Sequence, residues 1–377
     1  MQRQEWDVVI VGAGPAGCAA AAAAIRHVPP ERVLLVDRQL FPRDKACGDG
    51  VAFEALAALA DLGFDMSALL DGCPPIDRLR LQSPGGAVAD RQMRHPVRVI
   101  PRTVFDARLV ADVLARGVAF AHRAVRDVQT RPDGVLLDRE VRAGVVIGAD
   151  GAESVVRRAI GAPEPGAGRV ALAIRGYAPE LPGQHGAQWI TMTRRHWPAY
   201  AWSFPLGDGR ANVGYGELLT GRPLTRADML DRMRTLLPGL DPAVRGLRAH
   251  RLPLTPGRPA IRAGRVLLAG DALSLINPLS GEGIYYAVRS GALAGFAASR
   301  GGAAGSSYRR LMSRALGRHF RATDAAARMV RAPRLIDAGV RAAAHGQASF
   351  DDLVRLGLGD GVLTVRFLLA LGRRIPG

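Results

Sequence analysis

Two side chains that could take part in chemistry lie close together in the loop Lys45-Ala46-Cys47-Gly48. Lys45 is the only lysine in a chain whose lysines and arginines together number 51. An ammonium is a compact point charge that a guanidinium cannot replace, so we expect Lys45 near a bound cofactor or a substrate headgroup; chance placement is the alternative. Cys47 is a candidate proton donor or steric wall, and equally a small packed apolar group.

A second candidate group is aromatic. Tyr200, Trp202 and Phe204 alternate along a predicted strand, so all three side chains project from one face. Such a face forms an apolar wall that suits a long hydrocarbon or a polycyclic ring. Aromatic residues make up only 5% of the chain, yet these three and Trp197 cluster. We expect a substrate pocket here, in which Tyr200 and Trp202 join Cys47 and Lys45 as catalytic candidates; ordinary sheet packing is the alternative.

The cofactor on which these groups would act is indicated by the glycine-rich segment Gly12-Ala13-Gly14-Pro15-Ala16-Gly17, set between a predicted strand and helix. Gly12 suits a tight turn, Gly14 lets the backbone approach a pyrophosphate, and Gly17 lets the helix lie close to the sheet. The helix N-terminus adds free N–H groups and a positive dipole end. A second strand over 32–36 ends at Asp37, whose carboxylate would accept the ribose hydroxyls. The segment predicts dinucleotide binding.

A second glycine-rich segment follows far along the chain. Gly270-Asp271-Ala272 comes after a predicted strand over 265–269, and Asn277-Pro278-Leu279-Ser280-Gly281-Glu282-Gly283-Ile284 follows it. One such segment would suggest a nucleotide. Two of them, more than 250 residues apart, predict a flavin dinucleotide, FAD, bound by a discontinuous domain.

The elements that must position these residues predict an α/β fold: a Rossmann-like FAD-binding domain, an antiparallel β-sheet substrate domain and a C-terminal helical segment. Strands and helices alternate through the first 165 residues, β-like patterns fill about 169–219, and everything after Ser299 is typical of helix. We therefore assign residues 1–75, 98–165 and 255–300 to the FAD-binding domain. Residues 76–97 and 166–254 form the substrate domain, and 301–377 the helical segment.

Composition excludes several classes of function. The formal net charge is +17, but neither a helix-turn-helix nor a basic-aromatic pattern accompanies it, so we expect solvated arginines and no nucleic-acid partner. No metal site is expected. The three cysteines form no CxxC pair, as in a reducing cytoplasm. The apolar stretch 8–25 is interrupted by Gly-Pro-Ala-Gly, which favours strand and helix over a signal or spanning segment. The apolar stretch 362–371 either contacts a membrane surface or closes the substrate cavity.

These motifs, in this order, resemble the glutathione-reductase-like flavoproteins, which include aromatic hydroxylases, flavin halogenases and geranylgeranyl reductases. Residues 198–205, Pro-Ala-Tyr-Ala-Trp-Ser-Phe-Pro, match the Y-x-W-x-F-P signature of the geranylgeranyl reductase branch, and Lys45 to Gly48 are similar to its K-x-C-G element. Leu273 stands where hydroxylases usually carry a histidine. The chain is thus similar to the geranylgeranyl reductase family of FAD-dependent oxidoreductases.

The resemblance implies further cofactor contacts. Asp150-Gly151 would lie near the pyrophosphate, Asp271 would bind the ribityl chain, and Gly283 and Ile284 would approach the isoalloxazine; a helix-capping role for Asp150 is the alternative. Arg102, in an R-x-x-F-D pattern, would meet the FAD unless it forms a surface ion pair. The full predicted set is Gly12, Gly14, Ala16, Gly17, Asp37, Arg38, Lys45, Ala46, Cys47, Gly48, Arg102, Val125, Asp150, Gly151, Gly270, Asp271, Gly281, Gly283 and Ile284.

The function that the resemblance implies is reduction of C=C bonds in a prenyl, polyene-like or other hydrophobic substrate by hydride from reduced flavin. A monooxygenase that tailors a hydrophobic or aromatic small molecule is the alternative, since it would share the fold and the cofactor motifs. Gly357 to Gly361 lacks the strand and spacing of a second dinucleotide site. We therefore expect an external electron donor, NAD(P)H or a reduced protein or flavin. The expected location is the cytoplasm, with contact to the inner face of the membrane left open.

Overall fold

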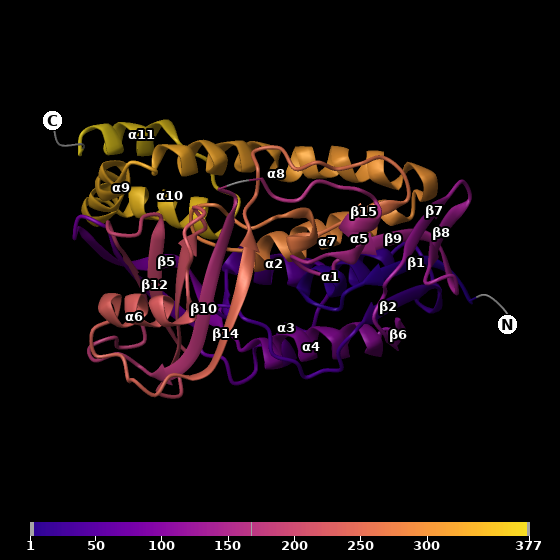
Figure 1. Cartoon of the computed structure of the whole chain (residues 1–377), viewed down its shortest axis with the longest axis horizontal. Helices are drawn as coiled ribbons and strands as arrows, with labels where there is room; N and C mark the ends of the chain where they lie inside the picture. Colours follow the sequence, from indigo (N-terminus) through magenta and orange to yellow (C-terminus); the bar gives the residue numbers. More distant parts are fainter. Residues whose placement is uncertain (1–3, 167, 375–377) are drawn as a thin grey trace.

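The computed structural model of the protein describes residues 4–166 and 168–374, so the assignments made for residues 1–3, 167 and 375–377 lie outside the described residues. The chain forms two β-sheets with helices packed around them (Figure 1). This confirms the predicted α/β class.

The first sheet is the core of the Rossmann-like half. Its parallel part has the order β6-β2-β1-β9-β15, and β8 and β7 extend it beyond β9 as antiparallel strands. Val8 pairs with Val33 and with Val145, so the apolar run predicted as the first strand is central. The strands are β1 (Gln4–Val11), β2 (Val33–Asp37), β6 (Ala119–His122), β7 (Val128–Arg131), β8 (Gly134–Leu137), β9 (Val141–Gly148) and β15 (Val266–Leu268).

Two helices from distant parts of the chain pack together against this sheet: α1 (Pro15–Ala24) and α7 (Ile284–Ala298). A Cβ atom at Gly291 or at Gly295 would lie 2.1 Å from a carbonyl oxygen of α1. The alanine-rich α1 and these glycines therefore allow a close backbone approach. This contact brings residues 284–298 against the first glycine-rich turn, as a discontinuous cofactor domain requires.

The second sheet has the order β14-β10-β13-β12-β11-β4-β5-β3. All neighbouring strands are antiparallel except β11 and β4, which are parallel, so the predicted antiparallel sheet contains one parallel pair. β14 was not predicted from the sequence, because this edge strand is mostly exposed and lacks apolar alternation. The strands are β3 (Gly50–Val51), β4 (Ile76–Gln82), β5 (Val88–Val99), β10 (Val170–Pro179), β11 (Gln188–Met192), β12 (Ala199–Pro205), β13 (Arg210–Leu218) and β14 (Arg245–Pro253).

Helices complete the fold. The C-terminal helices α9 and α10 pack on β5, where Val340, Ala343 and Phe350 join a buried cluster with Ile76 and Leu79. They lie with α11 at the opposite end of the molecule from β7 and β8 (Figure 1). The helices not yet given are α2 (Phe53–Asp61), α3 (Met66–Leu70), α4 (Arg102–Ala115), α5 (Val155–Ala159), α6 (Arg226–Leu236), α8 (Ala304–Met329), α9 (Pro333–His345), α10 (Gln347–Leu358), α11 (Val365–Gly372), and the short 3-10 turns η1 (Pro30–Arg32), η2 (Gly270–Leu273) and η3 (Gly301–Ala303).

The C-terminal part of the chain is helical, as predicted, up to the last described residue of α11. Among the described residues, none of these helices combines the length and the apolar content needed to cross a bilayer. The domain boundaries given above stay a prediction.

Candidate active site

A cavity of about 790 Å³ is lined by residues of both sheets and of the loop that contains Lys45 and Cys47. Gly17 and Gly270 of the predicted set do not line it. The structure brings the other predicted residues together on its wall: Gly12, Gly14, Ala16, Asp37, Arg38, Lys45, Ala46, Cys47, Gly48, Arg102, Val125, Asp150, Gly151, Tyr200, Trp202, Phe204, Asp271, Gly281, Gly283 and Ile284.

The first glycine-rich turn is shaped by its missing side chains. Gly12 has φ +103°, and a Cβ there would lie 2.3 Å from the carbonyl oxygen of Ala149. A Cβ at Gly17 would lie 1.8 Å from the carbonyl oxygen of Gly12, so only glycine lets α1 start this close to the turn. Gly270, with φ +57°, donates its N–H to Ser290 Oγ at 2.9 Å. Gly17 and Gly270 thus support the cavity from behind.

The same turn presents groups that suit a dinucleotide. A Cβ at Gly14 would meet only side-chain nitrogens, that of Arg43 at 3.3 Å and that of Arg102 at 3.8 Å. The backbone at Gly14 is therefore open to a pyrophosphate, with two cations beside it and the N-terminus of α1 behind it. Asp37 is buried at the end of β2, where its carboxylate accepts N–H groups of Ala13 at 2.8 Å and of Gln39 at 2.9 Å.

Arg102 forms a buried ion pair and not a surface one. Its guanidinium donates to both carboxylate oxygens of Asp106, at 2.6 and 2.7 Å, and Arg43 lies 3.2 Å from the same carboxylate. Burial opposes the charged form of Arg102, but the adjacent carboxylate holds its pKa above the ordinary value. The R-x-x-F-D pattern therefore places a permanent cation in the wall of the cavity.

Asp150 has the capping role considered for it and also lines the cavity. Its carboxylate accepts the N–H of Val155 at 2.7 Å and the hydroxyl of Ser154, so it holds the start of α5. Burial raises the pKa of this carboxyl, while these hydrogen bonds partly offset the rise. A capping role does not remove Asp150 from the site.

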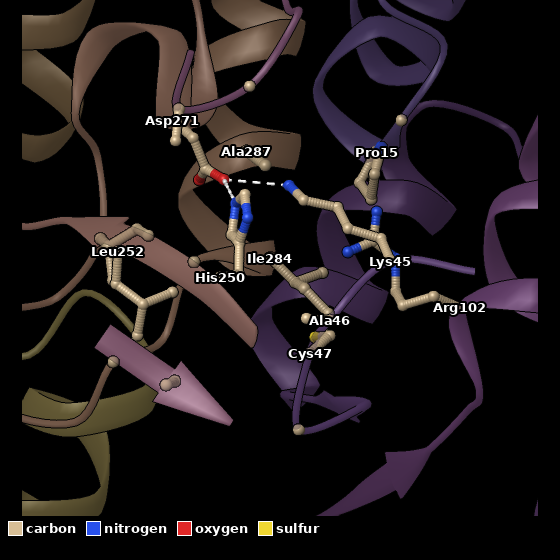
Figure 2. Close-up of a pocket in the computed structure, with 18 of the residues that line it drawn as sticks. Pro15, Lys45, Ala46, Cys47, Arg102, His250, Leu252, Asp271, Ile284 and Ala287 are labelled. Atoms are coloured by element: carbon tan, nitrogen blue, oxygen red, sulfur yellow. Dashed lines mark hydrogen bonds and ion pairs between the residues drawn. The ribbon is translucent and has the colours of Figure 1, made fainter. Parts of the chain in front are cut away.

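Lys45 lies where the two sheets meet. Its Nζ is 3.0 Å from Asp271 Oδ2 on η2, and His250 Nε2 on β14 is 4.0 Å from the same oxygen (Figure 2). Although burial raises the pKa of Asp271, the charge of Lys45 brings it below the usual range. Burial and the nearby ammonium together lower the pKa of His250 to about 4, so this imidazole is neutral at pH 7.

Cys47 is half-buried in the cavity wall, and burial raises the pKa of its thiol. The loop around it is held by the second sheet: Asn212 Nδ2 donates to the Cys47 carbonyl at 2.9 Å, and Arg175 donates to the carboxylate of Asp44. Asp49, fully buried, accepts hydrogen bonds from Tyr177 at 2.6 Å and from Asn212 at 2.8 Å. A side-chain network of β10 and β13 thus fixes the position of the thiol.

The aromatic side chains line the cavity together, as their alternation predicted. The ring centroids of Tyr200 and Trp202 are 5.9 Å apart, and those of Trp202 and Phe204 are 6.3 Å apart. A Cβ at Gly214 on β13 would lie 2.1 Å from the indole of Trp202, so a glycine on the neighbouring strand makes room for it. Leu79, Val97, Ile190 and Leu358 extend this apolar side of the cavity.

Glu282 is the acid of the second glycine-rich segment, and it lines the cavity. Its carboxylate accepts the N–H of Tyr285 at 2.8 Å at the start of α7, and burial raises its pKa to about 7. It belongs to the predicted cofactor motif but was not among the predicted site residues. Its position directly between Gly281 and Gly283 was the signal available in the sequence.

Other residues of the site were missed altogether. His250 belongs to the unpredicted edge strand, and Asn212 and Tyr177 lie in strands that contain other polar residues as well. A buried polar residue in a strand needs a hydrogen-bond partner, so Asn212 offered a weak signal of a network but no indication of its partner. Asp49, with φ +59°, gave no signal at all beyond its place next to Gly48.

The comparisons with known proteins agree with this geometry. Residues 5–197 match the family described as FAD binding domain, which confirms the predicted cofactor. Together with relatives that are named reductases, this match defines an FAD-dependent oxidoreductase. The chain is 34% identical to a menaquinone reductase of Mycolicibacterium smegmatis, over 78% of this chain and 77% of that protein. It is 31% identical to digeranylgeranylglycerophospholipid reductase 1 of Methanopyrus kandleri, over 77% of this chain and 80% of that protein.

A solved structure shows the same fold. A geranylgeranyl bacteriochlorophyll reductase-like protein from Thermoplasma acidophilum superimposes with a TM-score of 0.81, at 21% identity, over 99% of this chain and 97% of that one. The chain belongs to the geranylgeranyl reductase family of FAD-dependent oxidoreductases, as its motifs predicted.

Proposed function

We propose that this protein reduces C=C bonds of a prenyl or similarly hydrophobic substrate, with reduced FAD as the hydride source. The observation that carries the proposal is the apolar wall of Tyr200, Trp202 and Phe204, which lines the same cavity as the glycine-rich segments. A chamber of this kind accepts a hydrocarbon and keeps water away from it. The names of the relatives, a menaquinone reductase and a lipid reductase, agree with such a substrate.

The proposed cofactor contacts follow from the placement of the side chains. Asp37 would bind the ribose, Gly14 and the N-terminus of α1 the pyrophosphate, and Asp271 the ribityl chain. The isoalloxazine would lie between the Cys47 loop and Gly283 with Ile284. FAD supplies the hydride when it is bound and reduced. The residues of this chain would orient the substrate, exclude water from the cavity and deliver the proton.

For the proton, we propose Cys47. Burial raises the pKa of its thiol, so the group stays protonated at neutral pH and can donate. Lys45 would hold Asp271 ionised and in place, while Tyr200 and Trp202 would orient the substrate. Glu282 is a second acid on the cavity wall, and burial raises its pKa to about 7. It would supply the proton that Cys47 needs after each reduction.

The electrons would come from outside the chain. Gly357 to Gly361, a further glycine-rich stretch, begins in the last residues of α10. The carbonyl of Gly357 accepts hydrogen bonds from Asn277 and Ser280, and that of Gly361 contacts His319. The stretch therefore serves as a structural connection. We propose NAD(P)H or a reduced protein or flavin as a donor that binds transiently.

We further propose a cytoplasmic location with contact to the inner face of the membrane. On α11, Val365, Leu368 and Leu369 are exposed, and Arg373 follows the helix. α11 does not line the cavity, so it covers the substrate less directly than α10, which contributes Leu358. An exposed apolar face with arginines suits an anionic bilayer. Pelleting with anionic vesicles, lost in a Leu368→Ser, Leu369→Ser variant, would support the contact; equal pelleting of both proteins would refute it.

The reaction is tested by anaerobic incubation of the FAD-loaded, chemically reduced protein with a menaquinone and with a geranylgeranyl lipid. The expected product gains two hydrogens, and substrate addition reoxidises the flavin. Trp202→Leu should slow this reoxidation about tenfold or more, because the substrate is less well oriented. Trp197→Leu, a change outside the cavity wall, is the matched control. A product that forms only with oxygen and gains one oxygen atom would indicate the monooxygenase instead.

A further inference from the structure

Asn212 stands at the junction between the aromatic wall and the Cys47 loop. It is fully buried on β13, where it pairs with Phe204 on β12 and with Tyr177 on β10. Residues paired directly across neighbouring strands share a face of the sheet. Asn212 therefore faces the loop from the middle of the surface that also presents Trp202 and Phe204.

Three hydrogen bonds connect this amide to the site. Its Nδ2 donates to the carbonyl of Cys47 at 2.9 Å and to the carboxylate of Asp49 at 2.8 Å, and its Oδ1 accepts the indole N–H of Trp202 at 2.9 Å. An amide nitrogen has two hydrogens to donate, so both donors are occupied. One side chain thus joins the candidate proton donor to the candidate substrate wall.

We propose that Asn212 is a positioning residue, which fixes Cys47 and Trp202 relative to each other and thereby sets the substrate against the thiol. The part concerning catalysis rests on the function proposed above. The part concerning geometry does not, because the hydrogen bonds of Asn212 are made within the chain itself.

Side-chain contacts hold the loop in this position: Arg175 binds Asp44 and Tyr177 binds Asp49, while Asn212 also joins the loop to Trp202. Residues 43–49 form no helix or strand, and Asp49 adopts φ +59°, a region that non-glycine residues rarely occupy. A Cβ at Gly48 would lie 3.4 Å from the indole nitrogen of Trp202, so loop and ring are already in close contact. Loss of the amide would leave the Trp202 N–H without a partner and free the Cys47 carbonyl.

The connection between β10 and β11 offers a matched control. Gln184 is also a buried amide: its Nε2 donates to the carbonyls of Ala187 and Ser203, each at 2.9 Å, and its Oε1 accepts the N–H of Leu181 at 3.1 Å. It does not line the cavity, and its hydrogen-bond partners, Leu181, Ala187 and Ser203, lie outside the Cys47 loop. Gln184→Met removes a buried hydrogen-bonding group comparable to the one that Asn212→Leu removes.

The test compares FAD-loaded wild type, Asn212→Leu, Asn212→Asp and Gln184→Met. Asn212→Asp retains an acceptor for Trp202 but loses both donors to the loop. The first readout is the rate at which iodoacetamide alkylates Cys47, located by mass spectrometry, with Cys18 and Cys73 as internal references. The second is the split between kcat and KM in the reduction assay, and the third is the thermal midpoint of each protein.

We expect both Asn212 variants to alkylate at Cys47 about tenfold faster, and kcat to fall about 100-fold with little change in KM, because misplacement by about 1 Å has effects of this size. Gln184→Met should lower the thermal midpoint without either change. The proposal would be overturned if Cys47 were alkylated at the same rate in the Asn212 variants as in Gln184→Met. It would also be overturned if neither Asn212 variant folded, because Asn212 would then have a structural role only. If the Asn212 variants are alkylated faster but the wild type reduces no substrate, the geometric part of the proposal is supported and the proposed function is refuted.

Discussion

The two walls of the cavity are built from different parts of the polypeptide. On the side of the first sheet, backbone approaches backbone: Gly12 and Gly17 leave no space for a Cβ, and Gly291 lets α7 lie against α1. On the side of the second sheet, side chains hold the wall: Asn212 and Asp49 connect the strands to the Cys47 loop. The first wall depends on glycines, whose lack of a side chain allows close packing. The second wall depends mainly on polar side chains that must be in the right protonation state.

This difference fits what each wall would contact. A pyrophosphate is bound by backbone N–H groups and a helix N-terminus, for which close approach matters most. A hydrocarbon substrate offers no polar handle, so its orientation must come from the shape of the chamber, and that shape must be held from behind. The two walls should therefore respond differently to mutation.

The largest effect is expected at Gly17. Gly17→Ala places a Cβ 1.8 Å from the Gly12 carbonyl, and neither backbone can move without shifting α1 from the sheet. We expect a loss of about 3 kcal/mol or more in the free energy of unfolding, at the upper end of overpacking effects. Denaturant unfolding of the FAD-free protein measures it.

Gly14→Ala is the matched comparison for this prediction. Its Cβ would lie 3.3 Å from the end of the Arg43 side chain and in ordinary contact, at 3.8 Å, with Arg102, so the stability of the FAD-free protein should change by less than about 1 kcal/mol. The dissociation constant of FAD should rise about tenfold or more, which corresponds to about 1.4 kcal/mol. Similar stabilities for the two variants would show that the wall is not packed as tightly as described.

The same contrast explains what could be predicted from the sequence. Glycine spacing states a backbone requirement directly, so the roles of Gly12, Gly14 and Gly17 in the turn follow from their spacing alone. The alternation of Tyr200, Trp202 and Phe204 likewise follows from strand geometry. By contrast, the partners of Asn212 depend on which strands are neighbours and on where a loop without regular structure lies, and a short motif encodes neither. His250 was missed because an exposed edge strand has no apolar period.

A smaller effect, specific to the second wall, is expected from Asp49. Burial raises the pKa of this carboxyl from 3.8 to about 6 in the folded protein. Between about pH 4 and pH 6 the unfolded chain loses this proton first, so the contribution of Asp49 to folding stability falls as the pH rises. Asp49→Asn removes this titration. The free energy of unfolding of wild type relative to the variant should therefore drop by about 2–3 kcal/mol between pH 4 and pH 7.

Asp208→Asn is the control for that measurement. Hydrogen bonds from Arg210 lower the pKa of Asp208, which is partly exposed on the surface, so its contribution has the opposite sign and is small. Chemical unfolding at a series of pH values measures all three proteins. A wild type that shows no fall relative to Asp49→Asn would mean that Asp49 is ionised in the fold at little cost.

The smallest effect is expected where the walls meet, at Lys45 between Asp271 on η2 and His250 on β14. Burial and then the Lys45 charge hold the pKa of His250 at about 4. Lys45→Met removes the charge but not the burial, so the pKa should rise without reaching the ordinary 6.5. An NMR titration that follows the ring proton of His250 measures this pKa. The signal is assigned by its absence from the spectrum of His250→Gln. Arg248→Met, which removes an exposed cation paired with Asp44, should leave the titration unchanged. If the pKa of His250 shifted in both variants, it would depend on the overall charge of the second wall. A shift only in Lys45→Met would show that this one charge, between the two walls, sets the pKa.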